Sequence, residues 1–234
     1  MTTALFFALI AGLAIPVGGF LAWCDKISPD WGEEEFHHAI IAFGGGALIS
    51  AVALVLVPEG AARLTPLPAV ASFVLGGIAF YGLDCLLDRL GGSVAQLIAM
   101  MSDFIPEAIA LGATFASGES SAFLIAIMIA LQNLPEGFNA FRELTGQAQL
   151  SSRTVLVAFS LLSLLGPAAA FIGIEFFAER NAWLGTLMLF ASGGILYLTF
   201  EDIAPQAVLK NSRLPALGSI AGFALGLIGY MLTG

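Results

Sequence analysis

The strongest constraint on the fold of this chain is a succession of eight apolar segments, each about as long as a membrane is thick. A helix needs roughly 20 apolar residues to cross the hydrocarbon core of a bilayer. The segments are rich in Leu, Ala and Gly, and they lack the alternating pattern that strands of a membrane barrel require. They predict eight transmembrane helices over residues 3–23, 36–57, 69–88, 94–116, 121–142, 154–178, 183–206 and 214–233.

Composition agrees with a membrane environment. Hydrophobic residues make up 59% of the chain and charged residues 11%, whereas a soluble domain carries about 25% charged residues. The connections between the segments, such as "DRLGGS" and "AERN", are too short for a second domain. We therefore expect one transmembrane domain over residues 1–234, an all-α integral protein of a plasma membrane or a bacterial inner membrane. The net charge of −9 argues against a nucleic-acid partner.

The basic residues predict the orientation in the membrane. Cytoplasmic loops of membrane proteins carry an excess of Lys and Arg, a rule that holds for short loops like these. If both termini lie outside, six basic residues fall in cytoplasmic loops and two in outer loops, so this orientation is expected. The six are Lys26, Arg89, Arg142, Arg153, Lys210 and Arg213, and the two are Arg63 and Arg180.

Two of the apolar segments each carry a proline followed by a glutamate, within "SDFIPEAIALG" (residues 102–112) and "LQNLPEGFNAF" (residues 131–141). Asp103 and Glu107 lie four residues apart on the fourth predicted helix and therefore share a face. Gln132 and Glu136 repeat this spacing on the fifth. A carboxylate at membrane depth is retained mainly where it faces a protein interior or a water-filled path.

The two prolines predict kinks in the fourth and fifth helices. Proline has no amide hydrogen and clashes with the carbonyl four residues earlier, so Pro106 and Pro135 free the carbonyls of Ser102 and Leu131. Backbone groups freed at membrane depth are tolerated only inside protein or beside a cavity. A short loop joins the two helices, so they are expected to lie antiparallel as neighbours.

Their centres would bring together three carboxylates, two amide side chains and two spare carbonyls. The amides belong to Gln132 and Asn133. Oxygen-rich clusters of this kind bind divalent cations. The alternatives are that a buried Glu only bonds a neighbouring helix and that the prolines are simple kinks; the repetition favours an ion site.

At these residues the chain resembles the ZIP (Zrt/Irt-like) metal transporters. The pair "SDFIPEA" and "QNLPEG" is similar to the His-Asn-x-Pro-Glu-Gly motif of that family and its close repeat. The resemblance extends to "FGGGALISAVALVLVPEG", "FSLLSLLGPAAAFIG" and "ASGGILYLTFEDIAPQA", which look like the second, sixth and seventh helices of the family. It implies eight spans, both ends outside, and import of divalent metal into the cytoplasm.

Carried over by position, the resemblance implies a first metal site of Asp103, Glu107, Gln132 and Glu136. Asp103 and Gln132 stand where the family usually has histidines. An adjacent second site would involve Phe104, Asn133 and Gly166, but Phe104 and Gly166 have no ligand atom, so a binuclear centre is doubtful. The His-Glu pair of the seventh family helix becomes Glu201 and Asp202, and Asp84 stands at an acidic position of the third.

The donor types bear on which metal is carried. Imidazole suits zinc, copper, iron and nickel, whereas carboxylate and carbonyl oxygens suit magnesium, calcium and manganese. Zinc also accepts carboxylates. We therefore expect a divalent metal transporter for zinc, manganese or iron, with no cofactor beyond the transported ion. Its path would start among Glu59, Glu119 and Glu179 and leave towards Glu201 and Asp202.

The first polar loop, "DWGEEEFHH", offers a further set of metal ligands. Five residues of this loop could bind metal as it leaves the protein. Alternatively, the acidic residues are there because negative charge near a helix N-terminus is favoured by the helix dipole. The five are Glu33, Glu34, Glu35, His37 and His38.

Three questions stay open at this level. The chain could be a non-transporting membrane metal sensor or a degenerate family member. It could also be an intramembrane hydrolase using Asp103 and Glu107 with a metal, which is disfavoured because its two histidines lie together, far from that pair in sequence. A homodimer is compatible with the sequence, which does not determine the oligomeric state.

Overall fold

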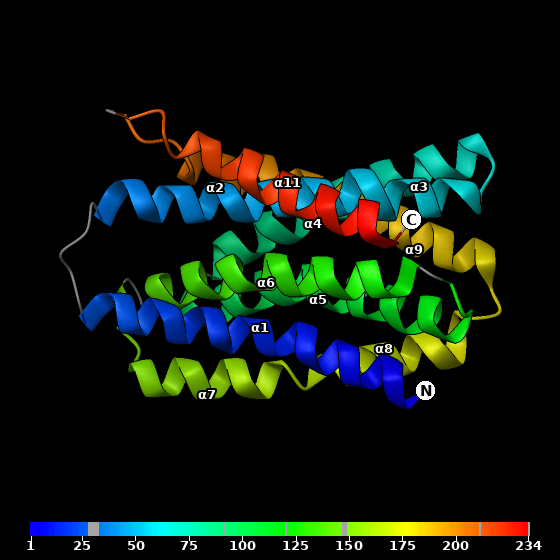
Figure 1. Cartoon of the computed structure of the whole chain (residues 1–234), viewed down its shortest axis with the longest axis horizontal. Helices are drawn as coiled ribbons and strands as arrows, with labels where there is room; N and C mark the ends of the chain where they lie inside the picture. The colour runs from blue at the N-terminus through cyan, green and yellow to red at the C-terminus, as the bar shows by residue number, and fades with distance from the viewer. Residues whose placement is uncertain (28–32, 91, 120, 147–148, 211, 234) are drawn as a thin grey trace.

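A computed structural model of the chain describes residues 1–27, 33–90, 92–119, 121–146, 149–210 and 212–233 (Figure 1). Within these ranges the chain is helical, without a named strand. The helices are α1 Thr2–Ile27, α2 Glu33–Ala51, η1 Val52–Leu56, α3 Val57–Ala62, α4 Pro66–Leu90, α5 Gly92–Ala116, α6 Ser121–Gly146, α7 Ser152–Leu162, α8 Leu165–Phe176, α9 Asn181–Leu198, η2 Thr199–Ile203, α10 Ala204–Gln206 and α11 Ala216–Thr233. The predicted fourth and fifth helices are α5 and α6.

The structure supports an all-helical membrane protein. Among the described residues, six stretches are long and apolar enough to cross a membrane, and Ala216–Leu232 forms a shorter apolar helix. The count of eight crossings and the outside location of the termini stay predictions, although both termini lie towards the same end of the bundle (Figure 1). The six stretches are Thr2–Cys24, Glu35–Ala62, Pro66–Leu87, Ser121–Gly146, Ser152–Phe176 and Asn181–Gln206.

Prolines mark two wide turns of the helices that the sequence analysis did not predict. Helix α5 continues through Pro106 and α6 through Pro135 without interruption, and kinks at these two prolines stay a prediction. The wide π-helical turns are η1, just before Pro58, and η2, just before Pro205. Each turn contains the residue four positions before its proline, whose carbonyl would clash with the ring. Widening the helix relieves that clash, and such turns are frequent at functional sites.

The helices pack as two bundles (Figure 1). In the first bundle α1 contacts α5, α6, α7 and α8, and α5 packs on α8. In the second bundle α2 packs on α11, and α9 packs on α3 and α4. The bundles meet where α2 contacts α6 and α5 contacts α9.

Glycines allow close contact within each bundle. An added Cβ at Gly137 of α6 would collide with the carbonyl of Ile15 in α1, and one at Gly46 of α2 would collide with that of Ser219 in α11. Small residues that let helix backbones approach are typical of membrane bundles. Gly46 belongs to the "GGG" run, which therefore serves packing.

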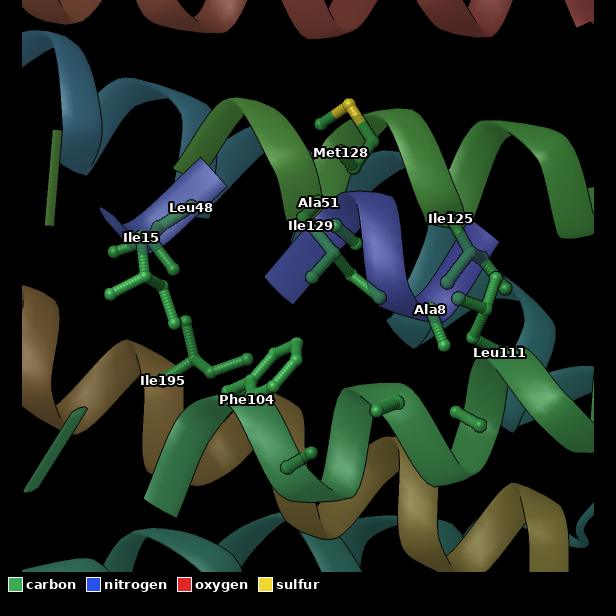
Figure 2. Close-up of a cluster of buried hydrophobic side chains, with 14 of the residues drawn as sticks. Ala8, Ile15, Leu48, Ala51, Phe104, Leu111, Ile125, Met128, Ile129 and Ile195 are labelled. Carbon is green, nitrogen blue, oxygen red and sulfur yellow. The ribbon is translucent and has the colours of Figure 1, made fainter. Parts of the chain in front are cut away.

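The junction between the bundles is mostly apolar. Figure 2 shows buried hydrophobic side chains that come from both bundles, with Ile15, Phe104 and Ile129 from the first and Leu48 and Ile195 from the second. Beside this cluster, four carboxylates line a cavity at the same junction.

Candidate metal centre

A polar cavity of about 90 Å³ lies at the junction of the two bundles, between α2, α5, α6, α9 and the η2–α10 segment. Four carboxylates and two amides line it, and no Lys or Arg is among the described lining residues. The polar lining residues are Asp103, Glu136, Asn139, Glu143, Asp202 and Gln206.

Asp103 of α5 and Glu136 of α6 form the inner part of this cavity. Asp103 is 8% exposed. Its Oδ1 and the Oε1 of Glu136 are buried and have no hydrogen-bond partner among the described residues. A buried acceptor without a partner is costly, and a cation bound in the cavity would satisfy both oxygens. The structure therefore brings these two predicted site residues together.

Glu107 and Gln132 lie one helical turn further towards the end that holds the chain termini. Both side chains are buried, and neither lines the cavity as far as the described residues define it. The Nε2 of Gln132 donates a hydrogen bond to Oε2 of Glu107, while Oε1 of Gln132 has no described partner. The four residues of the predicted first site thus occupy two successive levels.

Asn133 lies beside this second level. Its Nδ2 donates a 2.9 Å hydrogen bond to the carbonyl oxygen of Ala11 in α1, and its Oδ1 is buried without a described partner. A Cβ added at Gly166 would lie 2.7 Å from Cζ of Phe104. The buried ring of Phe104 thus packs directly on Gly166 of α8. At the predicted second site, only Asn133 offers a ligand atom.

Ser102 and Glu201 do not join the cavity. Oγ of Ser102 donates a 2.8 Å hydrogen bond to the carbonyl of Ile98, and the residue lines a separate apolar cavity with Phe80 and Phe190. Glu201 is exposed and absent from the described cavity lining, whereas its neighbour Asp202 lines it. Consecutive helical residues point about 100° apart, so adjacent acidic residues on one helix cannot share a face. That metal leaves towards both Glu201 and Asp202 stays a prediction.

The acidic first loop is only partly described. The side chains of Glu33 and Glu34 lie outside the described residues, and Glu35 is exposed. The rings of His37 and His38 are 5.9 Å apart, and the ring of His37 lies 6.1 Å from that of Phe138. Within the described part of the chain, no three His, Cys, Asp or Glu side chains gather closely enough to hold a metal ion. Metal hand-off by this loop stays a prediction.

At the end that holds the termini, two of the glutamates that were predicted to start the metal path contact an arginine. Nη1 of Arg63 lies 2.7 Å from Oε2 of Glu59, and its Nη2 pairs with Glu119. Burial alone would lower the pKa of Arg63, but its hydrogen bonds and ion pairs with Glu119 and Glu59 raise the pKa above its ordinary value. Glu59 and Glu119 therefore share one internal cation, which balances one of their two charges, and their place at the start of the metal path stays a prediction.

Three polar residues of the cavity escaped the sequence analysis, Asn139 and Glu143 on α6 and Gln206 on α10. Asn139 and Glu143 follow Glu136 by three and seven residues on α6. This spacing places these two residues and Glu136 on one helical face. The same periodicity in the sequence could have identified Asn139 and Glu143, but nothing in it showed which face of the helix meets a cavity.

Comparison with known families gives one match. The model of the family described as ZIP Zinc transporter matches residues 92–232, which is more than half of the chain. The matched range runs from α5 to α11 and contains all four carboxylates that line the cavity. A comparison with curated proteins finds no match.

Proposed function

The chain belongs to the ZIP zinc transporter family, and we propose that it carries zinc, manganese or iron into the cytoplasm through the site between α5 and α6. Members of this family are membrane transporters of divalent metal ions, not enzymes.

The observation that carries the proposal is the pair of unpartnered oxygens on Asp103 and Glu136, from facing helices at one cavity. Carboxylates inside a membrane protein mark ion pathways. Because no basic residue is among the described residues that line the cavity, a divalent cation is the natural counter-charge. Glu107 and Gln132 form the next level of the proposed path, where a passing ion would compete with their mutual hydrogen bond.

The donor set bears on the metal. Asp103, Glu107, Gln132 and Glu136 offer oxygen atoms and no imidazole or thiolate ligand. Such a set favours manganese over zinc more than a histidine site would, although zinc also accepts carboxylates. We therefore propose manganese or iron as substrates on a par with zinc.

The distribution of basic residues supports the inward direction. The cavity lies towards the end of the bundle where α4, α6 and α10 end and α7 begins (Figure 1). The helix ends and loops at that end carry Lys26, Arg89, Arg142, Arg153, Lys210 and Arg213. By the positive-inside rule this end faces the cytoplasm, so the cavity would release metal there. A homodimer stays a prediction.

The test is uptake of metal by liposomes that contain the purified protein, across a panel of zinc, manganese, iron, magnesium and calcium. We expect uptake of at least one of the first three, well above that of empty liposomes. If none of the panel is taken up or bound, the proposal is wrong.

A second candidate, a membrane metal sensor that does not transport, is favoured by one observation. The ring of Phe104 packs on Gly166 at the place of the second family site, which leaves a single proposed metal position near Asn133. Metal binding to the purified protein without uptake in liposomes would indicate this sensor.

A further inference from the structure

Another cavity lies next to the metal cavity, and its lining is of a different chemical kind. It is a groove of about 600 Å³ between α2, the η2–α10 segment and the start of α11. Ile203 lines both cavities, but no Asp or Glu is among the described residues that line the groove. Most of the groove is apolar, and four small side chains leave it open, those of Ala42, Ala204, Ala207 and Ala216.

Two basic residues complete the lining of this groove. Lys210 and Arg213 lie between α10 and α11, and both are exposed. The amide of Ser212 donates a 3.4 Å hydrogen bond to the carbonyl oxygen of Leu209, at the end of the bundle opposite the termini (Figure 1). Neither basic side chain forms an ion pair with another residue of the described part of the chain. Their charges are therefore available to a ligand.

The charge of the groove indicates what kind of ligand it suits. The chain has 17 acidic and 8 basic residues, so a groove lined by two basic and no described acidic side chains reverses the sign of the chain as a whole. Val208 and Leu214, beside the basic residues, are exposed apolar side chains, as expected where protein meets both hydrocarbon and water. A soluble anion would leave the apolar lining uncovered, and a neutral lipid would leave both charges unbalanced.

We propose that the groove binds one anionic phospholipid, with its phosphate group at Lys210 and Arg213 and an acyl chain along the apolar lining towards Ile49 of α2. Basic pockets between transmembrane helices on the cytoplasmic side bind anionic lipid headgroups, and the positive-inside rule assigns this end to the cytoplasm. Lipid binding here is separate from metal transport, because none of the four carboxylates of the metal cavity lines the groove.

The test is native mass spectrometry of the purified full-length protein in detergent, titrated with phosphatidylglycerol or with phosphatidylcholine of the same acyl chains. We expect phosphatidylglycerol to bind about 25-fold more tightly, since each basic residue near the headgroup contributes about fivefold. Lys210→Gln and Arg213→Gln should each lower its affinity about fivefold, and the double variant should bind both lipids equally. A parent without this preference, or a double variant that keeps it, would overturn the proposal.

Arg89→Gln is the matched control for the single variants. It removes one positive charge at the same end of the bundle, from α4, and Arg89 is not among the described residues of the groove. It should bind phosphatidylglycerol as the parent does, and an equal loss in this variant would show that the groove is not the site. The exchange Lys210→Arg with Arg213→Lys keeps both charges and should retain the preference. Loss of the preference in this exchange would contradict recognition by charge.

Two further measurements distinguish a lipid from other occupants. Ala204→Phe places an aromatic ring at an exposed position of the groove and should weaken both lipids on the order of tenfold, because it displaces the acyl chain. Glycerol phosphate, which carries the charge without the chain, should not displace phosphatidylglycerol. Unchanged affinities in Ala204→Phe, or displacement by glycerol phosphate, would indicate a site for free anions and overturn the proposal. A dimeric parent that binds neither lipid would also overturn it, since a second copy would then cover the groove.

Discussion

The two ends of the molecule use the same residue type in opposite ways. At the end that holds the termini, Glu59 and Glu119 are both paired with Arg63. At the other end, Glu136 and Glu143 line a cavity in which no described Lys or Arg takes part. A glutamate that forms an ion pair with an arginine stabilises the structure. A glutamate without such a partner keeps an uncompensated negative charge, which a bound metal ion can balance.

The ion pair at the first end also connects the bundles. Arg63 follows α3 of the second bundle, and Glu119 lies between α5 and α6 of the first. The side chain of Arg63 is only 10% exposed, so its charge is held mostly out of water and depends on the two glutamates. The cavity at the other end lies at the junction of the same two bundles, and no Lys or Arg is among its described lining residues.

The largest expected effect comes from the inner carboxylates. Replacing Glu107 or Glu136 with Ala should reduce metal uptake in liposomes to background, a loss on the order of 100-fold or more, because each removes a proposed ligand. Membrane insertion and monodispersity should be unchanged. Uptake at the parental rate by both single variants would show that the unpaired carboxylates are not the ion path.

A smaller effect is expected on selectivity. The double variant Asp103→His with Gln132→His replaces two oxygen donors with imidazoles, which suit zinc better than manganese. The ratio of zinc to manganese uptake in competition should rise on the order of tenfold. An unchanged ratio would place selectivity at another part of the proposed path, with the cavity residues Glu143 and Asp202 the next to test.

Removing the ion pair of Arg63 should lower the thermal stability of the protein and leave metal uptake unchanged. Arg63→Gln leaves Glu59 and Glu119 without their cation and should cost about 1 kcal/mol, since the partners are partly exposed. For a chain of this size the thermal midpoint would fall by roughly 2–4 °C. Manganese should restore part of that loss if the two freed glutamates bind it.

Glu119→Gln serves as the control for this variant, because it removes one of the two carboxylates and leaves Arg63 paired with Glu59. It should show a smaller fall in the midpoint and no manganese effect. A midpoint equal to that of the parent in Arg63→Gln would mean that the ion pair does not hold the bundles together.

The smallest expected effect is a difference in apparent manganese affinity between variants of two adjacent residues of η2. Asp202 lines the cavity and Glu201 does not, so Asp202→Asn should lower the apparent affinity for manganese uptake about tenfold. Glu201→Gln should change it less than about twofold, because its charge lies off the path and is screened by solvent. Equal losses in the two variants would contradict the separation of these side chains.

Several features were determined by the sequence alone. The apolar segments predicted helices because length and hydropathy act within one stretch of chain, and α1, α4 and α6 occur where expected. The spacing of Asp103, Glu107, Gln132 and Glu136 placed each pair on one helical face, since helical periodicity is also local. The match to the ZIP family over residues 92–232 agrees with the resemblance carried by those residues.

Other features depended on how the helices pack. The partner of Arg63 lies 56 residues away at Glu119, and the contact of Phe104 with Gly166 joins α5 to α8. The wide turns lie just before Pro58 and Pro205, whereas α5 and α6 continue through Pro106 and Pro135. The local sequence does not show which prolines are preceded by a π-helical turn and which lie within a continuous α-helix.

The cavity itself was decided by tertiary structure. Glu143 carries the same side chain as Glu59, and no property of either residue predicts that one lines a cavity and the other pairs with Arg63. That difference arises because the rotation of α6 and the phase of η2 set which side chains meet between the bundles. The sequence therefore determined that carboxylates would be buried at membrane depth, and only the packing of the helices decided which of them remain free for a cation.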